Sequence, residues 1–248
     1  MNNNPFTGAA YFFRGLKMLG HPALRKFVVI PLVLNIGFFA LLTYFAYGAV
    51  NEFVTYMMES LPSWLQWLEI ILMVLFVGVI LIFVYFTFSI FANLFAAPFN
   101  SVLAEATEEL LIGGSITETS VSDSFTQIIP AIKDEIGKLT YTLTRSIPFL
   151  VLFFIPGVNF IASIAWFFMS AWILALEYND YPMGNNNKLF VEQRNIASQR
   201  RWLNLGFGSA ISVLTMIPFV NFLVIPSAVV GATIMYVENF QDENLQTD

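Results

Sequence analysis

The chain has 248 residues, of which 57% are hydrophobic and 11% are charged, and its formal net charge at pH 7 is −6. This acidic balance is not typical of a nucleic-acid-binding protein, and the absence of cysteine from the sequence excludes disulfides and thiolate metal sites. With one histidine, no P-loop, no dinucleotide fingerprint and no nucleophile elbow, the sequence predicts no metal, no cofactor, no catalytic residue and therefore not an enzyme.

Four long stretches of the sequence contain no Asp, Glu, Lys, Arg or His: residues 27–51, 70–104, 146–176 and 202–237. A charged side chain in hydrocarbon costs at least about 2.5–3.5 kcal/mol, so uncharged runs beyond about 18 residues are typical of membrane segments. The four runs make up about half of the chain, which leaves too little for a separate catalytic domain. We therefore predict one all-α membrane domain over residues 1–248.

The N-terminal residues 5–19 predict an amphipathic helix at the membrane surface. Apolar side chains at helical spacing line one side of it (Phe6, Ala9, Phe13 and Leu16). Arg14 and Lys17 can reach from the same helix toward lipid headgroups. The first apolar run starts too late and is too long for a signal peptide, so we expect it to remain as a span.

A Gly-His-Pro break at residues 20–22 ends that helix and restarts the chain at the first membrane run. Four cations (Arg14, Lys17, Arg25 and Lys26) and the free N–H groups of a new helix start are expected to converge there. Glycine lets backbone approach a ligand, and an arginine fork can bind two oxygens of one anion. An oxyanion would fit this segment; alternatively, the cations only anchor the first span to anionic lipid headgroups.

The first two runs predict two long transmembrane helices, 27–51 and 70–104. At 1.5 Å per residue the first is about 37 Å long, enough to cross a hydrocarbon core of about 30 Å. The second is expected to continue as a helix to Ile112, beyond the bilayer, until Gly113-Gly114 ends it. Residues 105–145 are therefore predicted as a projecting or amphipathic helical segment.

The third and fourth runs contain nearly the same segment near their starts, IPGVNF at residues 155–160 and IPFVNF at residues 217–222. The helical residues before each proline reach about 14–16 Å, only about half of the hydrocarbon thickness. We therefore predict two copies of one unit, which are re-entrant, half-penetrating helical hairpins at residues 146–176 and 203–237. Irregular backbone at that depth must be covered, so the tips are expected inside an assembly.

Lys and Arg are distributed unevenly among the connecting segments. Four occur in residues 1–26, three in 105–145 and four in 177–201, but none in 51–69 or after 237. Hairpins place all three basic segments on the cytoplasmic side, as the positive-inside bias favours, whereas single spans would not. The bias leaves antiparallel insertion of two copies open.

Few polar side chains could line a route through the membrane. Asn159 and Asn221 lie at the predicted hairpin tips, where each amide either faces a transported ion or caps the turn of its own broken helix. Carboxylates stand at the ends of the apolar runs (Glu105, Glu108, Glu177 and Glu238). They either mark the interface or pair with Lys or Arg, or they take protons if transport is proton-coupled. Residues 238–248 are expected to form an acidic, solvated tail.

The segment Gly15-Leu16-Lys17-Met18-Leu19 matches a Gly-Leu-x-x-Leu signature, and the basic pair Arg25-Lys26 follows it. With the doubled Ile-Pro-x-Val-Asn-Phe segment and the overall length, the chain resembles the CysZ sulfate permeases of bacterial inner membranes. The resemblance implies sulfate uptake for cysteine biosynthesis, two long transmembrane helices plus two half-penetrating hairpins, and homo-oligomers. It also implies sulfate binding at Gly15, Leu16, Arg25 and Lys26, to which we add Lys17 at a variable position of the signature.

Two functions of different classes follow. The first is a multi-pass sulfate permease of the inner membrane, without an ATP-driven step because the sequence has no nucleotide motif. The second is a non-transporting membrane scaffold, whose basic N-terminal segment binds anionic lipid and whose hairpins serve only assembly.

Overall fold

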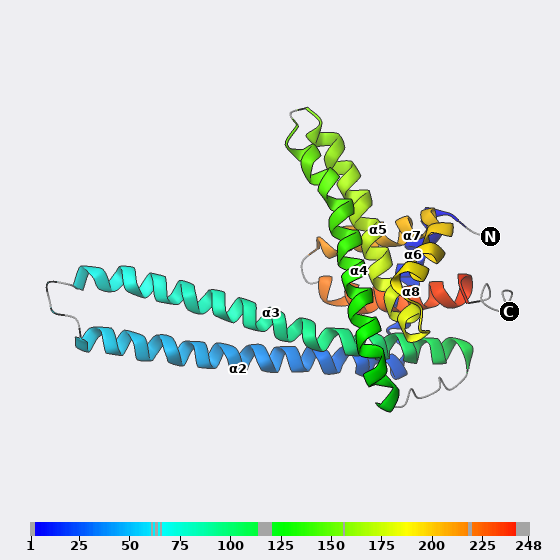
Figure 1. Ribbon diagram of the computed structural model, residues 1–248. Helices are drawn as coiled ribbons and strands as arrows, with labels where there is room; N and C mark the ends of the chain where they lie inside the picture. Colours follow the sequence, from blue (N-terminus) through cyan, green and yellow to red (C-terminus); the bar gives the residue numbers. More distant parts are fainter. Residues whose placement is uncertain are drawn as a thin grey trace. The chain divides into compact units, whose positions relative to one another are not determined.

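The computed structural model describes residues 3–60, 62, 64, 66–113, 121–155, 157–217 and 220–241. Within these ranges the chain folds into helices joined by turns, without a β-strand, so the predicted all-α class is confirmed. The helices are α1 (Pro5–Met18), α2 (Pro22–Ser60), α3 (Gln66–Ile112), α4 (Val121–Phe153), α5 (Asn159–Asn185), α6 (Phe190–Gln199), α7 (Arg201–Thr215) and α8 (Asn221–Asn239) (Figure 1). The prolines of the two predicted hairpin tips (Pro156 and Pro218), the side chain of Asn221 and the acidic tail beyond Gln241 lie outside the described residues.

The chain divides into two compact units. One is Lys26–Phe99, and the larger one combines Met1–Arg25 with Asn100–Asp248. Helices that are long and apolar enough to cross a membrane occur in both units. In the described part of the chain they are Pro22–Met57, Ile70–Ala92, Asn159–Asn185 and Phe222–Asn239.

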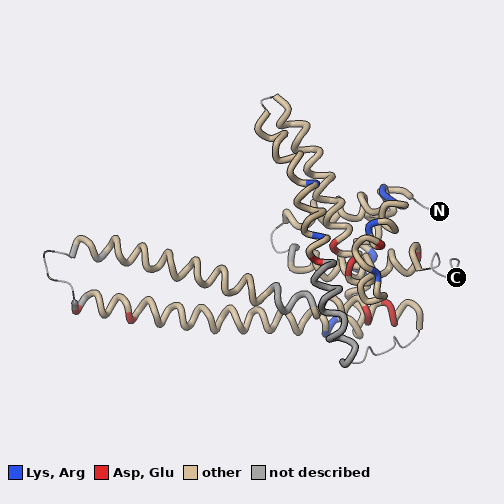
Figure 2. The backbone as a smooth tube through the Cα atoms, in the orientation of Figure 1, with Lys and Arg blue, Asp and Glu red and all other residues tan. Residues whose placement is uncertain are grey.

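The Lys26–Phe99 unit consists of the apolar stretches of α2 and α3. Aromatic rings join the two helices: Phe38 stacks on Phe91 with ring centroids 3.5 Å apart, and Phe53 stacks on Phe76 at 3.9 Å. No residue in the most apolar window of either helix is buried within the chain. Apolar surface of this extent requires lipid or another chain around it, and Figure 2 shows it almost free of charged residues.

α3 continues to Ile112, as the sequence predicted, and its 47 residues correspond to about 70 Å of helix. Gly113 follows with φ of +72°, a left-handed conformation that glycine adopts readily after a helix. The part from Asn100 onward belongs to the larger unit, where Leu103 and Ala104 are fully buried. The segment predicted to project beyond the bilayer is therefore packed into a protein core.

α8 forms the centre of the larger unit. In its most apolar window 61% of the residues are buried, compared with none in the apolar windows of α2 and α3. α1 and α5 both pack against α7 and α8. The buried side chains of α8 include Val224, Ala228, Val229, Val230, Ala232, Ile234, Met235 and Tyr236.

α1 exists as predicted, and the apolar side that the sequence assigns to the membrane surface is not buried in the protein. Asn4 caps its start by accepting the N–H of Phe6 at 2.9 Å. Phe6 and Phe13, on the predicted apolar side, are 82% and 54% exposed. The side that faces the protein is formed by Gly8, Tyr11, Phe12 and Gly15. α1 is therefore a packed helix of the core that keeps a second apolar side exposed.

Glycines explain how closely α1 approaches its neighbours. A Cβ at Gly8 would overlap the carbonyl oxygen of Leu203 in α7, and one at Gly206 would overlap the carbonyl oxygen of Pro5. In the same way, a Cβ at Gly231 in α8 would lie 2.6 Å from the carbonyl oxygen of Tyr11. Small residues at helix crossings let backbones meet in this way, as is common between membrane helices.

A pair of helices flanks each of the two turns that the sequence predicted, while the arrangement of two membrane hairpins stays a prediction. α4 packs against α5 in a hairpin whose outer end extends away from the rest of the larger unit (Figure 1), and α7 contacts α8. Gly157 allows the first turn with φ of +83°. The first arm is not a separate short helix, because α4 runs unbroken from Val121 to Phe153 and joins the amphipathic segment to the hairpin. The depth of both hairpins in a membrane remains a prediction.

Candidate functional site

The predicted break between the first two helices is confirmed, since α1 ends at Met18 and α2 begins at Pro22. Backbone hydrogen bonds close the turn between them. The N–H groups of Leu19, Gly20 and His21 donate to the carbonyls of Gly15, Lys17 and Met18 at 3.0, 3.2 and 2.8 Å. The donors at the end of α1 are therefore occupied.

The first N–H groups of α2 have partners as well. The N–H of Ala23 donates to Nδ1 of His21 at 3.4 Å, and those of Leu24 and Arg25 donate to the carbonyl of His21 at 3.0 and 3.3 Å. Pro22 has no N–H to offer. The expectation of free backbone donors at this helix start is therefore wrong, because the His21 side chain caps the helix and short turn bonds use the remaining groups. An anion bound here would depend on side chains.

Gly15 packs against α8, whereas the sequence predicts that it lets the backbone approach a ligand. A Cβ at this position would overlap the carbonyl oxygen of Ser227 and the backbone of Gly231. The missing side chain serves the contact between α1 and α8, so the predicted reason for this glycine is wrong. Leu16 lies on the outer side of the same turn and is 40% exposed.

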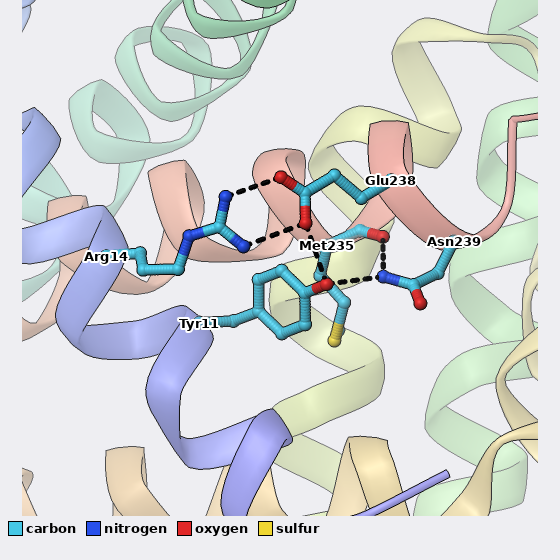
Figure 3. Close-up of polar contacts among 5 residues, drawn as sticks. All are labelled: Tyr11, Arg14, Met235, Glu238 and Asn239. Atoms are coloured by element: carbon cyan, nitrogen blue, oxygen red, sulfur yellow. Dashed lines mark hydrogen bonds and ion pairs between the residues drawn. The ribbon is translucent and has the colours of Figure 1, made fainter. Parts of the chain in front are cut away.

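Arg14 is held by a bidentate ion pair with Glu238 of α8 (Figure 3). Its Nη1 donates to Oε2 at 2.8 Å and its Nη2 donates to Oε1. The Tyr11 hydroxyl donates to the same Oε2 at 2.9 Å and accepts from Nδ2 of Asn239 at 2.8 Å. The hydrogen bonds to Glu238 raise the pKa of Arg14, and burial raises the pKa of Tyr11. Arg14 is thereby neutralised, and the expected pairing of terminal carboxylates with cations is confirmed for Glu238.

Lys17 faces a cavity of about 580 Å³ beside the break. This volume lies within the range of small-ligand sites, about 300–1,000 Å³. Among the described residues, no carboxylate pairs with Lys17. The cavity is lined by Arg14, Lys17, Met18, Gly20, His21, Pro22, Leu111 and Ile234. His21 is a lining residue that the sequence reading did not single out, although it stands in the Gly-His-Pro break.

The basic pair after the break does not line this cavity. Nε of Arg25 donates to the carbonyl of Gly20 at 2.9 Å, so this exposed guanidinium braces the turn and keeps its other donors available. Lys26 is the first residue of the other compact unit, in which its Nζ lies 4.8 Å from the centroid of the Phe27 ring. Of the predicted residues, Gly15, Leu16, Lys17 and Arg25 therefore lie at one turn of the larger unit.

The Oδ1 of Asn159, the first residue of α5, accepts the N–H of the next residue, Phe160, at 3.0 Å. Val158 stands at the N-cap position, and no side chain caps this helix start. The choice between an ion-facing amide and a turn cap at this tip stays a prediction.

Glu108 is a buried carboxylate without a cation. It is 3% exposed and accepts from Nδ2 of Asn186 at 3.0 and 3.2 Å and from Nε2 of Gln241 at 3.4 Å. In the part of the chain that the structure describes, no Lys or Arg pairs with it. Burial raises its pKa, and the charge of Glu105 adds to that effect. Among the described residues, Glu108 therefore does not follow the cation-pairing alternative, and no local signal could have shown its partner Asn186, 78 residues away.

Comparison with known proteins places these features in a family. Residues 11–226 match the family described as Sulfate transporter CysZ/Etoposide-induced protein 2.4. A curated relative, the Sulfate transporter CysZ of Pectobacterium atrosepticum, is 36% identical over 237 residues, which cover 95% of this chain and 86% of the relative. Together with the four apolar helices found among the described residues, this relationship makes the chain a multi-pass membrane protein. The chain therefore belongs to the Sulfate transporter CysZ/Etoposide-induced protein 2.4 family.

Proposed function

We propose that this protein is a sulfate permease of the bacterial inner membrane that supplies sulfate for cysteine biosynthesis. The observation that carries the proposal is the relationship to a protein named as a sulfate transporter over 95% of the chain. The family description names transporters, which supports the expectation that the chain is not an enzyme. The described helices long enough to cross a membrane supply the framework for such a role.

Sulfate recognition falls to cationic side chains at the break between α1 and α2. Sulfate carries two negative charges and is strongly hydrated. Hydrogen-bond donors of the protein, or water within the site, therefore have to replace its hydration shell. Because the backbone N–H groups of the break are occupied, Lys17, Arg25 and Lys26 are the groups that can supply charge. Gly15 and Leu16 belong to the site by position, since Gly15 fixes the turn against α8.

The two helical hairpins penetrate the membrane halfway, and their tips meet inside a homo-oligomer. The exposed apolar side chains near the turn between α4 and α5 support this arrangement. Phe154 is 86% exposed and Phe160 is 74% exposed. The described residues leave most of both rings uncovered, and contact with lipid or a second copy would cover them. The copies lie either parallel or antiparallel in the bilayer.

Uptake of labelled sulfate into liposomes that contain the purified protein tests the function. We expect faster uptake than in protein-free vesicles. Equal rates would remove the permease and leave the lipid-binding scaffold as the function of the chain.

Two substitutions test the site through sulfate binding by the purified protein. Lys17→Gln and Arg25→Gln each remove one charge and are expected to weaken sulfate binding about tenfold, the size typical of a hydrogen bond to a charged group. Arg201→Gln removes an exposed charge elsewhere in the larger unit and serves as the matched control. Unchanged sulfate affinity in both site variants, measured by titration calorimetry, would place recognition elsewhere without affecting the proposed transport.

A further inference from the structure

Tyr141 is fixed at the junction of three helices in the larger unit. Its hydroxyl accepts a hydrogen bond from Nε1 of Trp172 in α5 at 3.0 Å. Its ring meets the ring of Phe190 in α6 edge to face, with centroids 5.6 Å apart. Both contacts belong to a small apolar cluster around Leu176 and Ala197. The ring of Tyr141 is therefore a rigid, partly buried platform between α4, α5 and α6.

Two guanidinium groups lie against this one ring. Cζ of Arg145, one turn farther along α4, is 5.7 Å from the ring centroid, and Cζ of Arg194 in α6 is 5.3 Å from it. A cation over an aromatic face within about 6 Å is attracted by the ring quadrupole. Cation–π attraction to the Tyr141 ring thus offsets the repulsion between the two positive charges.

Neither arginine has a counterion within the described residues. No carboxylate pairs with Arg145 or Arg194 there, and neither guanidinium donates a hydrogen bond to that part of the chain. Lys138, one turn before Tyr141 on α4, shows the contrast, because it pairs with Asp180 at 2.5 Å and Glu135 at 3.1 Å. Guanidinium groups with unused N–H donors are the side chains that bind sulfate or phosphate oxygens in bidentate fashion.

Their place in the sequence puts these arginines where polar and apolar surface meet. Arg145 is the last charged residue before the uncharged run 146–176, and Arg194 lies in the polar segment that follows it. Figure 2 shows the outer part of the α4 and α5 hairpin without charged residues. A site at this boundary between polar and apolar surface can be reached both by dissolved anions and by phospholipid headgroups.

We propose that Arg145 and Arg194, held on the ring of Tyr141, form a second oxyanion site that is separate from the break between α1 and α2. Its ligand is a tetrahedral oxyanion, supplied either as free sulfate or as the phosphate of an anionic lipid. The site exists independently of transport, so it does not require the proposed permease function.

Binding of two probes to the full chain in neutral detergent tests the proposal. The first arm titrates sulfate into a Lys17→Gln/Arg25→Gln background, where the break no longer contributes. The second arm follows phosphatidylglycerol and phosphatidylcholine by native mass spectrometry. Adding Arg145→Gln and Arg194→Gln is expected to weaken at least one oxyanion probe about tenfold per arginine. Loss in the sulfate arm identifies the free anion, and loss restricted to phosphatidylglycerol identifies a headgroup.

Two further variants distinguish specific binding at Arg145 and Arg194 from nonspecific attraction of anions to positive charge. Arg201→Gln removes one exposed arginine and is expected to leave both probes unchanged. Arg145→Lys with Arg194→Lys keeps both charges but loses the forks, and is expected to bind more weakly than the wild type and more tightly than the Gln variant. If the double Gln variant fails to fold, each single Gln variant answers the same question. Wild-type binding of both probes in the Gln variants, or an equal loss in Arg201→Gln, would overturn the proposal.

Discussion

At the scale of single residues, the polar contacts of this chain differ mainly in whether a charge has a partner. Arg14 is neutralised by Glu238, whereas Lys17 faces its cavity without a carboxylate among the described residues. Glu108 is the opposite case, a buried acid whose described partners are amides. Burying a charge without an opposite charge is costly. The ionised carboxylate of Glu108 is therefore expected to lower the free energy of unfolding.

Replacing Glu108 with Gln is expected to stabilise the protein at pH 8 and to have little effect at pH 4. The pKa of Glu108 is raised above the ordinary value of 4.5. The folded state therefore holds its proton more tightly, and stability is lost as pH rises from the unfolded pKa to the folded one. Thermal unfolding in detergent is expected to show a gain of about 2–4 °C at pH 8, or about 1 kcal/mol in a chain of this size. Glu52→Gln, at an exposed position, is the control, and a gain that does not depend on pH would contradict the assignment.

At the scale of elements, glycines and small residues decide which helices touch. α1 approaches α7 through Gly8 and Gly206, and approaches α8 through Gly15 and Gly231. The exposed sides of α2 and α3 have no such contacts, and a Cβ at Gly48 would meet nothing within 4 Å. Glycines of one chain therefore have different roles, and the same substitution should give opposite results.

Gly15→Ala is expected to destabilise the protein by about 1–3 kcal/mol, because the new methyl group overlaps the backbone of α8. Gly48→Ala is the matched control and should be neutral or stabilising by up to about 1 kcal/mol, since alanine favours a helix interior. Thermal unfolding of both variants in the same detergent provides the comparison. Weaker sulfate binding by Gly15→Ala at unchanged stability would show that this glycine serves a ligand and not the packing.

At the scale of the whole molecule, the open question is how the hairpins meet the membrane. The chain has no cysteine, so one introduced cysteine gives a unique label. The proposed re-entrant hairpins end on the side where they begin. Near the turn between α4 and α5, Phe154 is 86% exposed, which the proposed topology explains by contact with lipid or a second copy.

Thr144→Cys and Asn195→Cys, exposed positions on either side of the hairpin of α4 and α5, are expected to react with a membrane-impermeant maleimide from the same side of sealed vesicles. Trp64→Cys, between α2 and α3, should react from the other side and serves as the control. Partial labelling from both sides at all three positions would indicate antiparallel copies. Labelling of Thr144→Cys and Asn195→Cys from opposite sides would contradict the hairpin.

The sequence by itself determined the helical class, the apolar runs, the break at residues 20–22 and the end of α3 at Gly113. These features depend on residues a few positions apart, since helical periodicity, a proline or a glycine acts within one or two turns. The repeated segments likewise marked where α5 and α8 begin, because turn signals act locally.

Only the tertiary structure decided which side of α1 is buried and which cations remain available. Arg14 meets Glu238 across 224 residues, and Arg145 and Arg194 share a ring although they stand on different helices. Such contacts depend on how closely helices pack, and that distance is set by side-chain volume at crossings that no local pattern reveals. The candidate site was therefore predictable as a segment, but not in its geometry.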